Sequence, residues 1–415
     1  MNESILLCEE FVKRQNILFL THRFPYPPNR GDRIRSYNLL RVLAGQFNVS
    51  LACTSDEPVS EEQIRHVMQF CSQLHIAELG TWSRRIRGGL ALLGKKSLTE
   101  AMFHSPSLKK TIQKWHGQKA FDKLIVFCSS MYPYATSRCF RQTPKTVDLV
   151  DVDSEKWKQL ATERSFPMSW IYGREADAVH RLETKIGKYS ELITLVSDAE
   201  AELYRERCRP SSPAIGVSNG VDTNYFGPKT QGSKNTGTSV SNLIFTGVLD
   251  YTPNVEGMIW FCKEVMPKLR DHGDFRIRVV GRRPCINVQE LQQIDGVEIV
   301  GEVPDVRPYL HEADIAISPL HLARGIQNKV LEAMACGLPT VVSPQSAEGI
   351  DATSGKEFYI ADTPEDWVDT LCRLAASPEQ RKLIGKAARM LAEDRYSWSA
   401  KLSKFIDTID KTDSM

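Results

Sequence analysis

Two cations and a carboxylate stand close together in the stretch "ARGIQNKVLEAMACG". Arg324 and Gly325 lie in a loop after the strand-like run "ADIAISPL", and Lys329, Val330 and Glu332 fall in the first turns of a predicted helix. A helix N-terminus favours an anion, and Arg and Lys side chains bind phosphate oxygens. The stretch therefore predicts a diphosphate pocket, with Glu332 placed to accept hydrogen bonds from ribose hydroxyl groups. The alternative is an exposed Lys–Glu pair, which stabilises little.

A second candidate site is the Pro-rich turn "RFPYPPNRGDRIRSY", which follows the first predicted strand. Gly31 lets a ligand approach the backbone, and the N-terminus of the next helix favours an anionic group. We assign Gly31, Asp32 and Arg33 to the acceptor side of the site. The turn lacks the Gly-x-Gly-x-x-Gly pattern of a dinucleotide fingerprint. An ordinary strand-to-helix turn remains the alternative interpretation.

Two carboxylates form the third candidate site, in "VDLVDVDSEKW". Asp151 and Asp153 follow a strand-like run, and carboxylates at the carboxyl end of a strand can orient a sugar or accept a proton. Either residue could instead cap the helix that begins near Ser154.

Strands and helices alternate along the chain, which predicts parallel α/β sheets. Ile17–Leu20 and "NVSLACTS" flank a helix expected over residues 33–44, and "LHIAEL", "KLIVFCS", "TVDLVDV" and "LITLVS" continue the strand series. After the polar run 227–241, strands are expected at "NLIFTGVL", "FRIRVVG", "VEIVG", "IAISPL" and "PTVVS". The pocket helix should run over about 327–336 and end at Gly337. Two such series indicate two Rossmann-like domains facing each other across a cleft, where ligands bind at the carboxyl ends of strands.

The composition excludes several classes of protein. The net charge is only +2, so no nucleic-acid partner is expected. Ten cysteines form no Cys-x-x-Cys pair, which is typical of reduced, buried thiols. Neither a signal peptide nor an apolar membrane span is found, which predicts a cytoplasmic protein.

One segment, "WSRRIRGGLALLGKKSL" from Trp82 to Leu98, combines aromatic and aliphatic residues with cations and contains no acidic residue. Such a segment can lie on an anionic membrane surface. The alternative is a basic loop between a strand and a helix.

The motifs together resemble those of the retaining glycosyltransferases with the GT-B fold, of the family-4 or group-1 type. "VSNGVDTNYFGP" resembles the interdomain segment of that family, and "VEIVGEVPDVRPYLHEADIAISPL" and "KVLEAMACGLPTVVSPQSAEGI" resemble its nucleotide-sugar site. The variants "RFPYPPNRGDRIRSYNLL", "VDVDSEKW" and "ARGIQNKVLEAMA" look most like the sugar transferases associated with bacterial exosortase and exopolysaccharide loci.

The resemblance implies an acceptor-binding domain over residues 1–212, a donor-binding domain over 213–395 and a C-terminal helix over 396–415 that returns to the first domain. Donor contacts are then expected from the residues of the opening stretch and from the ends of the preceding strands, namely Gly247, Asn254, Gly281, Arg282, Arg324, Gly325, Lys329, Val330 and Glu332. Catalysis is expected to involve Asp151, Asp153, Arg324 and Lys329, with no bound metal or cofactor. The acceptor is expected to be a glycan or a lipid-linked sugar.

Two departures from the family pattern affect the donor site. The family often carries a Glu eight residues before the position of Glu332, and this chain has Arg324 there. Many members also place cations where this chain has Val248 and Pro253. We hypothesise that Arg324 and Lys329 supply these charges from the opposite wall of the pocket. A nucleotide-sugar epimerase of the same fold and a non-catalytic sugar-nucleotide-binding protein are the alternative functions.

Overall fold

The computed structural model describes residues 14–80, 94, 96–228, 240–323 and 326–411. Their contacts divide the chain into two compact units, residues 1–219 with 402–415 and residues 220–401. The sequence placed the boundary between residues 212 and 213. The structure places it later because a short strand, β7 (Ala214–Gly216), pairs with the strand before it in the sheet of the first unit.

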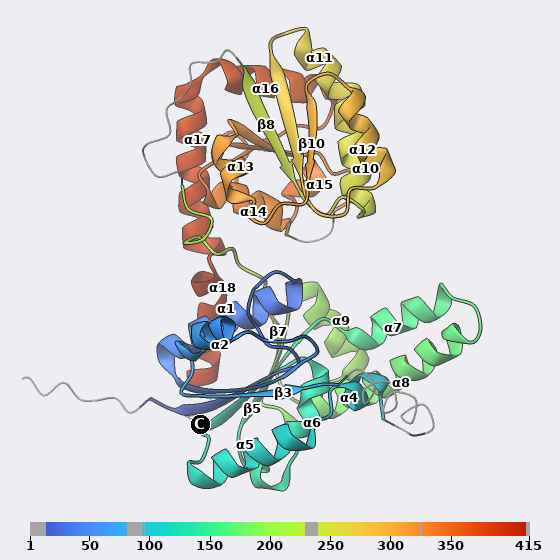
Figure 1. The fold of residues 1–415 in the computed structure, drawn as a ribbon, viewed down its shortest axis with the longest axis vertical. Coiled ribbons are helices and arrows are strands. Elements are labelled where there is room, and N and C mark those ends of the chain that lie inside the picture. Colours follow the sequence, from blue (N-terminus) through green and yellow to red (C-terminus); the bar gives the residue numbers. More distant parts are fainter. Residues whose placement is uncertain (1–13, 81–93, 95, 229–239, 324–325, 412–415) are drawn as a thin grey trace, which may run out of the picture. The chain divides into compact units, whose positions relative to one another are not determined.

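Within its described residues, the first unit holds a seven-stranded parallel sheet in the order β3-β2-β1-β4-β5-β6-β7 (Figure 1). Helices cover both faces of a parallel sheet, so its strands are apolar on both sides and appear in the sequence as apolar runs. Besides β7, the strands are β1 (Asn16–Thr21), β2 (Asn48–Ser55), β3 (Gln73–Glu78), β4 (Lys123–Phe127), β5 (Lys145–Val150) and β6 (Leu192–Leu195). The helices are α1 (Gly31–Gln46), α2 (Glu61–Met68), α4 (Leu98–Met102), α5 (Pro106–Gln118), α6 (Tyr132–Ala135), α7 (Asp153–Thr162), α8 (Met168–Tyr189) and α9 (Asp198–Cys208).

The described part of the second unit holds a six-stranded parallel sheet in the order β10-β9-β8-β11-β12-β13. Its strands are β8 (Ser241–Thr246), β9 (Phe275–Val280), β10 (Val297–Gly301), β11 (Ile315–Ser318), β12 (Thr340–Val342) and β13 (Tyr359–Ile360). Its helices are α10 (Thr252–Trp260), α11 (Met266–Arg270), α12 (Ile286–Gln289), α13 (Arg307–Glu312), α14 (Asn328–Ala335), α15 (Pro344–Ala347), α16 (Pro364–Ala376) and α17 (Pro378–Leu391). The last helix, α18 (Trp398–Lys411), begins in the second unit, and its residues from Leu402 belong to the first.

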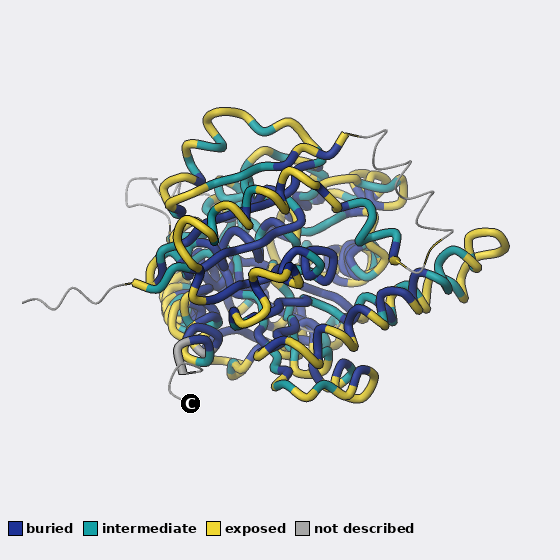
Figure 2. Tube along the Cα trace, turned by 90° about the horizontal axis from the view of Figure 1, so that it is seen from below, coloured by how far each residue is buried: buried dark blue, intermediate teal, exposed yellow. Residues whose placement is uncertain are grey.

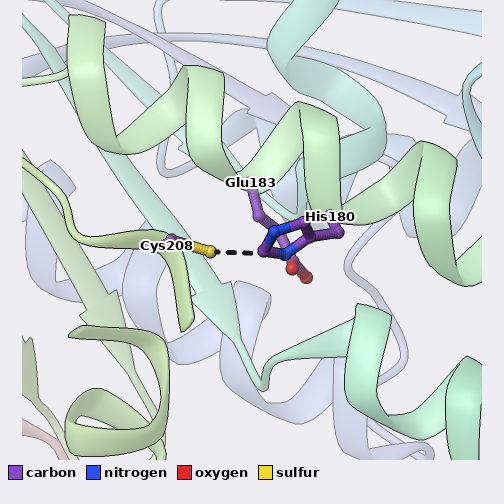
Figure 3. A group of neighbouring side chains, drawn as sticks. All are labelled: His180, Glu183 and Cys208. Carbon is purple, nitrogen blue, oxygen red and sulfur yellow. Dashed lines mark hydrogen bonds between the residues drawn. The ribbon is translucent and has the colours of Figure 1, made fainter. Parts of the chain in front are cut away.

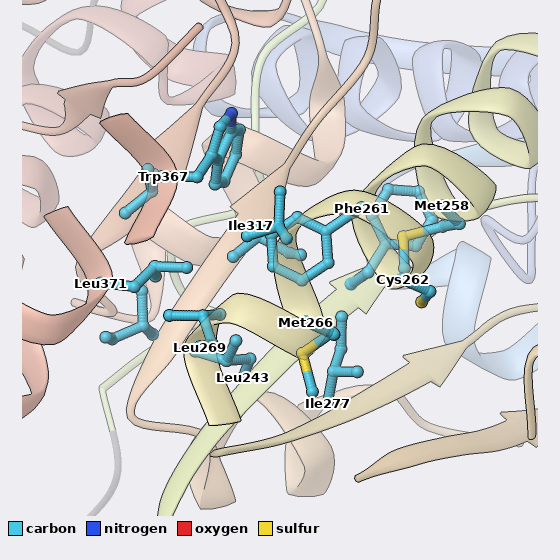
Figure 4. Close-up of a cluster of buried hydrophobic side chains, with 14 of the residues drawn as sticks. Leu243, Met258, Phe261, Cys262, Met266, Leu269, Ile277, Ile317, Trp367 and Leu371 are labelled. Atoms are coloured by element: carbon cyan, nitrogen blue, oxygen red, sulfur yellow. The ribbon is translucent and has the colours of Figure 1, made fainter. Parts of the chain in front are cut away.

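Each unit has its own hydrophobic core. In the second unit, Phe261, Met266 and Leu269 pack under the sheet against Trp367 and Leu371 of α16 (Figure 4). The central strands of both sheets are mostly buried, and the exposed residues lie mainly on the outer faces of helices and in loops (Figure 2). Among the described residues, no helix is both long enough and apolar enough to cross a bilayer.

A buried ion pair ties the first helix to the strand edge that carries the candidate site. Arg35 of α1 donates from Nε and a terminal nitrogen to the two carboxylate oxygens of Asp148 in β5, at 2.8 and 3.1 Å. The same guanidinium donates to the carbonyl of Val217 at 2.8 Å and to Oδ1 of Asn219 at 2.9 Å. Both charged side chains are 2% exposed. Arg35 therefore holds residues 217–219, the last residues before the chain enters the second unit, beside α1 and β5.

Removing Arg35 should destabilise the first unit strongly. Arg35→Ala leaves the Asp148 carboxylate buried and unpaired, which costs about 3–5 kcal/mol of the free energy of unfolding. Arg30→Ala removes a half-exposed cation from the start of the same helix, where ion pairs contribute about 0–1 kcal/mol. Urea unfolding of the two variants, followed by circular dichroism, compares them. Equal stability of Arg35→Ala and Arg30→Ala would contradict the role given to the buried pair.

Candidate functional site

The strand order reverses once in each sheet, and the candidate residues gather at these two points. In the second unit the reversal lies between β8 and β11, and in the first unit it lies between β1 and β4. Loops that follow the two strands at such a point diverge, which leaves room for a ligand at their carboxyl ends.

Helix α14 begins at this edge of the second sheet. Its Val330, Leu331 and Met334 are buried in a hydrophobic cluster, which holds the helix on the sheet. Gly337 has φ +72° and ends the helix, as the sequence predicted, because the left-handed region suits glycine. Arg324 and Gly325 lie outside the described residues.

Lys329 reaches from α14 to the start of α10. Its Nζ donates to Oδ1 of Asn254 at 2.5 Å and lies 4.5 Å from the ring centroid of Phe245. Asn254 in turn donates from Nδ2 to the carbonyl of Val248 at 2.8 Å. The structure therefore joins the loop after β8, the first turn of α10 and the first turn of α14 through one ammonium group.

Burial shifts the pKa values of both ionisable groups on α14 towards neutrality. It lowers the pKa of Lys329 to about 7, although the nearby Glu332 carboxylate opposes this shift. Burial likewise raises the pKa of Glu332 to about 7, opposed by the Lys329 charge. A bound anion beside Lys329 would favour the ammonium form and raise its pKa again.

Gly281, at the end of β9, has a packing role. A Cβ atom at this position would lie 1.6 Å from the carbonyl oxygen of Gly247, so only glycine lets the two strand ends approach so closely. Arg282 follows and is exposed, and its carbonyl accepts from the N–H of Leu249 at 2.9 Å. Val330 was also expected to contact the donor, and its side chain is 1% exposed.

In the first unit, sequence reasoning missed His22 and Arg23, which follow β1 directly. Arg23 donates to Oδ2 of Asp32 at 2.7 Å, and Nε2 of His22 lies 3.3 Å from the same oxygen. Although burial opposes the shift, hydrogen bonds from His22 and Arg23 hold the pKa of Asp32 well below its usual range. Burial lowers the pKa of His22, and its Nδ1 is buried without a hydrogen-bond partner in the described part of the chain.

The other residues of the Pro-rich turn are placed differently from Asp32. Arg33 is 6% exposed, and its guanidinium donates to Oε2 of Glu57 at 2.7 Å. Gly31 is the first residue of α1, and a Cβ atom there would meet nothing within 4 Å. Of the three expected residues, Asp32 is thus the one held beside His22 and Arg23.

Asp151 and Asp153 follow β5 at the same edge of the first sheet. Lys156 forms a short hydrogen bond with Asp151 and lies 3.9 Å from Oδ1 of Asp153. Burial raises the pKa of Asp153 to about 6. Burial also raises the pKa of the Cys128 thiol, and the charges of Asp153, Asp148 and Asp32 add to that shift. Acidic groups of α1, β5 and α7 therefore influence one partly buried thiol, which directly follows β4.

A separate cluster in the first unit has the residue types of a metal site. His180 and Glu183 of α8 and Cys208 of α9 offer ligand atoms that lie within 4.8 Å of one another (Figure 3). The Glu183 carboxylate already accepts hydrogen bonds from the amide and hydroxyl groups of Ser154. Burial raises the pKa of Cys208 to about 12, so the thiol keeps its proton at neutral pH. Hydrogen bonding therefore accounts for this cluster.

One family model matches part of the second unit. Residues 241–377 match the family model of the group 1 glycosyl transferases. The matched range contains Gly247, Asn254, Gly281, Lys329 and Glu332. The edge of the second sheet that carries the candidate donor site therefore lies within the group 1 match.

Two relatives share sequence with the chain. A D-inositol 3-phosphate glycosyltransferase from Saccharomonospora viridis is 35% identical over 98 residues, which is 23% of this chain and 22% of that protein. The chain thus spans about a fifth of the length of that relative. An uncharacterized protein in the cps region of Klebsiella pneumoniae is 20% identical over 359 residues, covering 83% of this chain and 87% of that protein.

Solved structures show the fold of the whole chain. Sucrose-phosphate synthase from Thermosynechococcus elongatus has a TM-score of 0.62 at 15% identity, covering 97% of this chain and all of that one. HepE from Anabaena, in complex with UDP and glucose, has a TM-score of 0.58 at 13% identity. The alignment covers 96% of this chain and all of the HepE chain. The two parallel sheets and these likenesses show that the chain has the GT-B fold, as the sequence predicted.

Proposed function

We propose that this protein is a glycosyltransferase that moves a sugar from a nucleotide-diphosphate sugar to a hydroxyl acceptor, with retention at the anomeric carbon. The observation that carries the proposal is the group 1 match, because it spans the residues that gather where the strand order of the second sheet reverses. The related HepE structure holds UDP and glucose, which supports a nucleotide sugar as the donor here.

The N-terminus of α14 and Lys329 are proposed to bind the diphosphate. The unpaired N–H groups at the start of a helix point towards a bound anion, and an ammonium group adds a full charge. Glu332 follows Lys329 on a neighbouring face of the helix and would accept hydrogen bonds from the ribose. The charges already present in the site provide the countercharge, so we expect donor binding without a metal ion.

The contact between Lys329 and Asn254 supports the compensation hypothesis. In the family resembled, one of the missing cations belongs at the position of Pro253, the residue directly before Asn254. The Lys329 ammonium group lies against Asn254 and therefore brings a charge from α14 to the start of α10. Arg324 would supply the other charge from the loop before α14.

In the proposed reaction the acceptor hydroxyl attacks the anomeric carbon from the face that the diphosphate leaves. The bond from this carbon to the phosphate oxygen breaks with its electron pair, a bond to the acceptor oxygen forms, and a diphosphate oxygen takes the hydroxyl proton. Lys329, Arg324 and the helix N-terminus stabilise the charge that grows on the leaving group. Asp151 or Asp153 would orient a sugar, and His22 and Asp32 are further polar groups at the edge of the first sheet.

We propose a lipid-linked or growing exopolysaccharide glycan as the acceptor, used at the cytoplasmic face of the membrane. The resemblance to exopolysaccharide-associated transferases supports this choice, as does the relative in the cps region of Klebsiella pneumoniae. The basic segment Trp82–Leu98 was expected to contact the membrane, and residues 81–93 and 95 of it lie outside the described residues.

Product analysis tests the proposed function. A thermal-shift panel of UDP-, GDP- and ADP-sugars first selects donors, because a ligand that binds the native state raises the apparent stability of the protein. The protein is then incubated with the selected donors, for example UDP-glucose, GDP-mannose or ADP-glucose. We expect one donor to release its nucleoside diphosphate when a glycan acceptor is added. An isomerised sugar nucleotide would identify an epimerase, and binding without any product would identify a non-catalytic protein.

The two proposed phosphate contacts can be tested separately from turnover. Arg324→Ala and Lys329→Ala should each raise the donor dissociation constant about 10- to 100-fold, because a charge-assisted hydrogen bond contributes roughly 1.5–3 kcal/mol. Isothermal titration calorimetry measures the constant. Lys268→Ala removes an exposed lysine of α11 and serves as the matched control. Unchanged donor binding in both site variants would refute the charge compensation.

A further inference from the structure

We propose that Asn254 is a positioning residue of the donor site, which acts on the donor through the Lys329 ammonium group and not by direct contact. Asn254 lies in the first turn of α10 and is 4% exposed. This role rests on the proposed function, because Lys329 is the residue proposed to bind the diphosphate. The sequence predicted instead that Asn254 contacts the donor itself.

The side-chain amide of Asn254 is engaged at both ends by the protein. Its Oδ1 accepts a hydrogen bond from Nζ of Lys329 at 2.5 Å, and its Nδ2 donates to the carbonyl of Val248 at 2.8 Å. Chemistry fixes this orientation, because an ammonium group can only donate and a carbonyl oxygen can only accept. A flipped amide would lose both hydrogen bonds. The amide oxygen of Asn254 therefore faces the lysine.

The surroundings of Asn254 hold this amide in place. A Cβ atom at Gly247 would lie 2.9 Å from Nδ2 of Asn254, so the glycine leaves the space that the amide occupies. The loop that accepts from the amide is itself fixed. The N–H of Leu249 donates to the carbonyl of Arg282 at 2.9 Å, and the N–H of Cys285 donates to the carbonyl of Leu249 at 3.2 Å. The lysine therefore meets an acceptor at a fixed position.

The acceptor that Asn254 offers is uncharged, which matters at an anion site. An amide oxygen orients the Lys329 ammonium group without neutralising it. The ring of Phe245, whose centroid lies 4.5 Å from Nζ, is likewise uncharged and is buried. The carboxylate that acts on the lysine is that of Glu332, on the same helix. A carboxylate at position 254 would be a second counter-ion and would compete with the diphosphate. Asn254 thus orients the lysine and leaves its charge available to the ligand.

A double-mutant cycle tests whether Asn254 acts through Lys329. Isothermal titration calorimetry measures the donor dissociation constant, with whichever of UDP-glucose, GDP-mannose and ADP-glucose binds wild-type protein. Asn254→Ala should raise this constant about ten-fold, because the ammonium group then lacks the acceptor that orients it. In the Lys329→Ala background the same substitution should cause no further loss. An equal loss in both backgrounds would show a direct donor contact and overturn the proposal, as would an unchanged constant for Asn254→Ala alone.

The charge state of Lys329 gives a second readout that needs no ligand. Isotope-labelled lysine lets NMR follow the pKa of Lys329, whose signal is the one absent from the spectrum of Lys329→Arg. Asn254→Asp should raise this pKa, because it places a carboxylate against the ammonium group. The same variant should raise the donor dissociation constant about ten-fold or more, because the diphosphate must then displace that carboxylate.

Asn38→Asp, in α1 of the first unit, is the matched control. Asn38 is also 4% exposed, and its Nδ2 donates to the carbonyl of Ile34 at 2.8 Å. The control therefore loses the same kind of hydrogen bond and should keep the wild-type lysine pKa and donor binding. Thermal unfolding checks that the variants fold.

Two results of the aspartate substitutions would overturn the proposal. The first is a pKa of Lys329 that Asn254→Asp leaves unchanged, and the second is equal donor binding by Asn254→Asp and Asn38→Asp. Wild-type protein that binds no nucleotide sugar would contradict the proposed function instead. The ligand-free titration would still decide whether Asn254 holds the lysine, so the two failures are distinguishable.

Discussion

A parallel sheet places all its ligand-binding loops at one edge, and the strand order decides where along that edge they separate. In the second unit this point lies between β8 and β11, and α14 begins there. The apolar face of α14 is buried, so its first turn, whose N–H groups lack partners within the helix, is held at this edge of the sheet. The proposed donor site depends on this placement, because the helix supplies both the fixed partial charge and the lysine.

The Lys329 ammonium group is the central electrostatic feature of that site. It contacts Asn254 and the face of Phe245, and the Glu332 carboxylate lies nearby on the same helix. Burial removes water from the amine and outweighs the attraction of the Glu332 carboxylate, which explains the lowered pKa of Lys329. A diphosphate would supply the missing negative charge. The arrangement therefore favours an anionic ligand over an empty site.

The sequence predicted the fold well where apolar runs were long. The apolar runs that form β1, β2 and β9 were predicted as strands, because strands covered on both faces consist mostly of apolar residues. The two- and three-residue strands β13 and β7 were missed because they carry too few residues for a pattern. Between α10 and α11 the chain forms a π-helical stretch at Phe261–Val265, which no sequence period marks.

The candidate site was predicted less evenly, for reasons that lie in long-range contacts. Lys329 was identified because its position at a helix start is local information. The burial of Arg33 against Glu57 was not foreseen, because the partner lies on a distant loop. His22 was missed although it directly follows the first strand. Its side chain becomes significant only when Asp32 is folded back against it.

Proton uptake on donor binding tests the central claim most directly, because the phosphates of a nucleotide sugar do not titrate near neutrality. Calorimetry at pH 8 counts the protons when the titration is repeated in buffers of different ionisation enthalpy. The ligand is the nucleotide sugar, among UDP-, GDP- and ADP-sugars, that binds most tightly. The free Lys329, with a pKa of about 7, is largely neutral at pH 8, and a bound diphosphate raises its pKa. The account predicts uptake of nearly one proton by the wild-type protein and none by Lys329→Arg, since Arg is always charged. No uptake by the wild-type protein, or equal uptake by the variant, would contradict it.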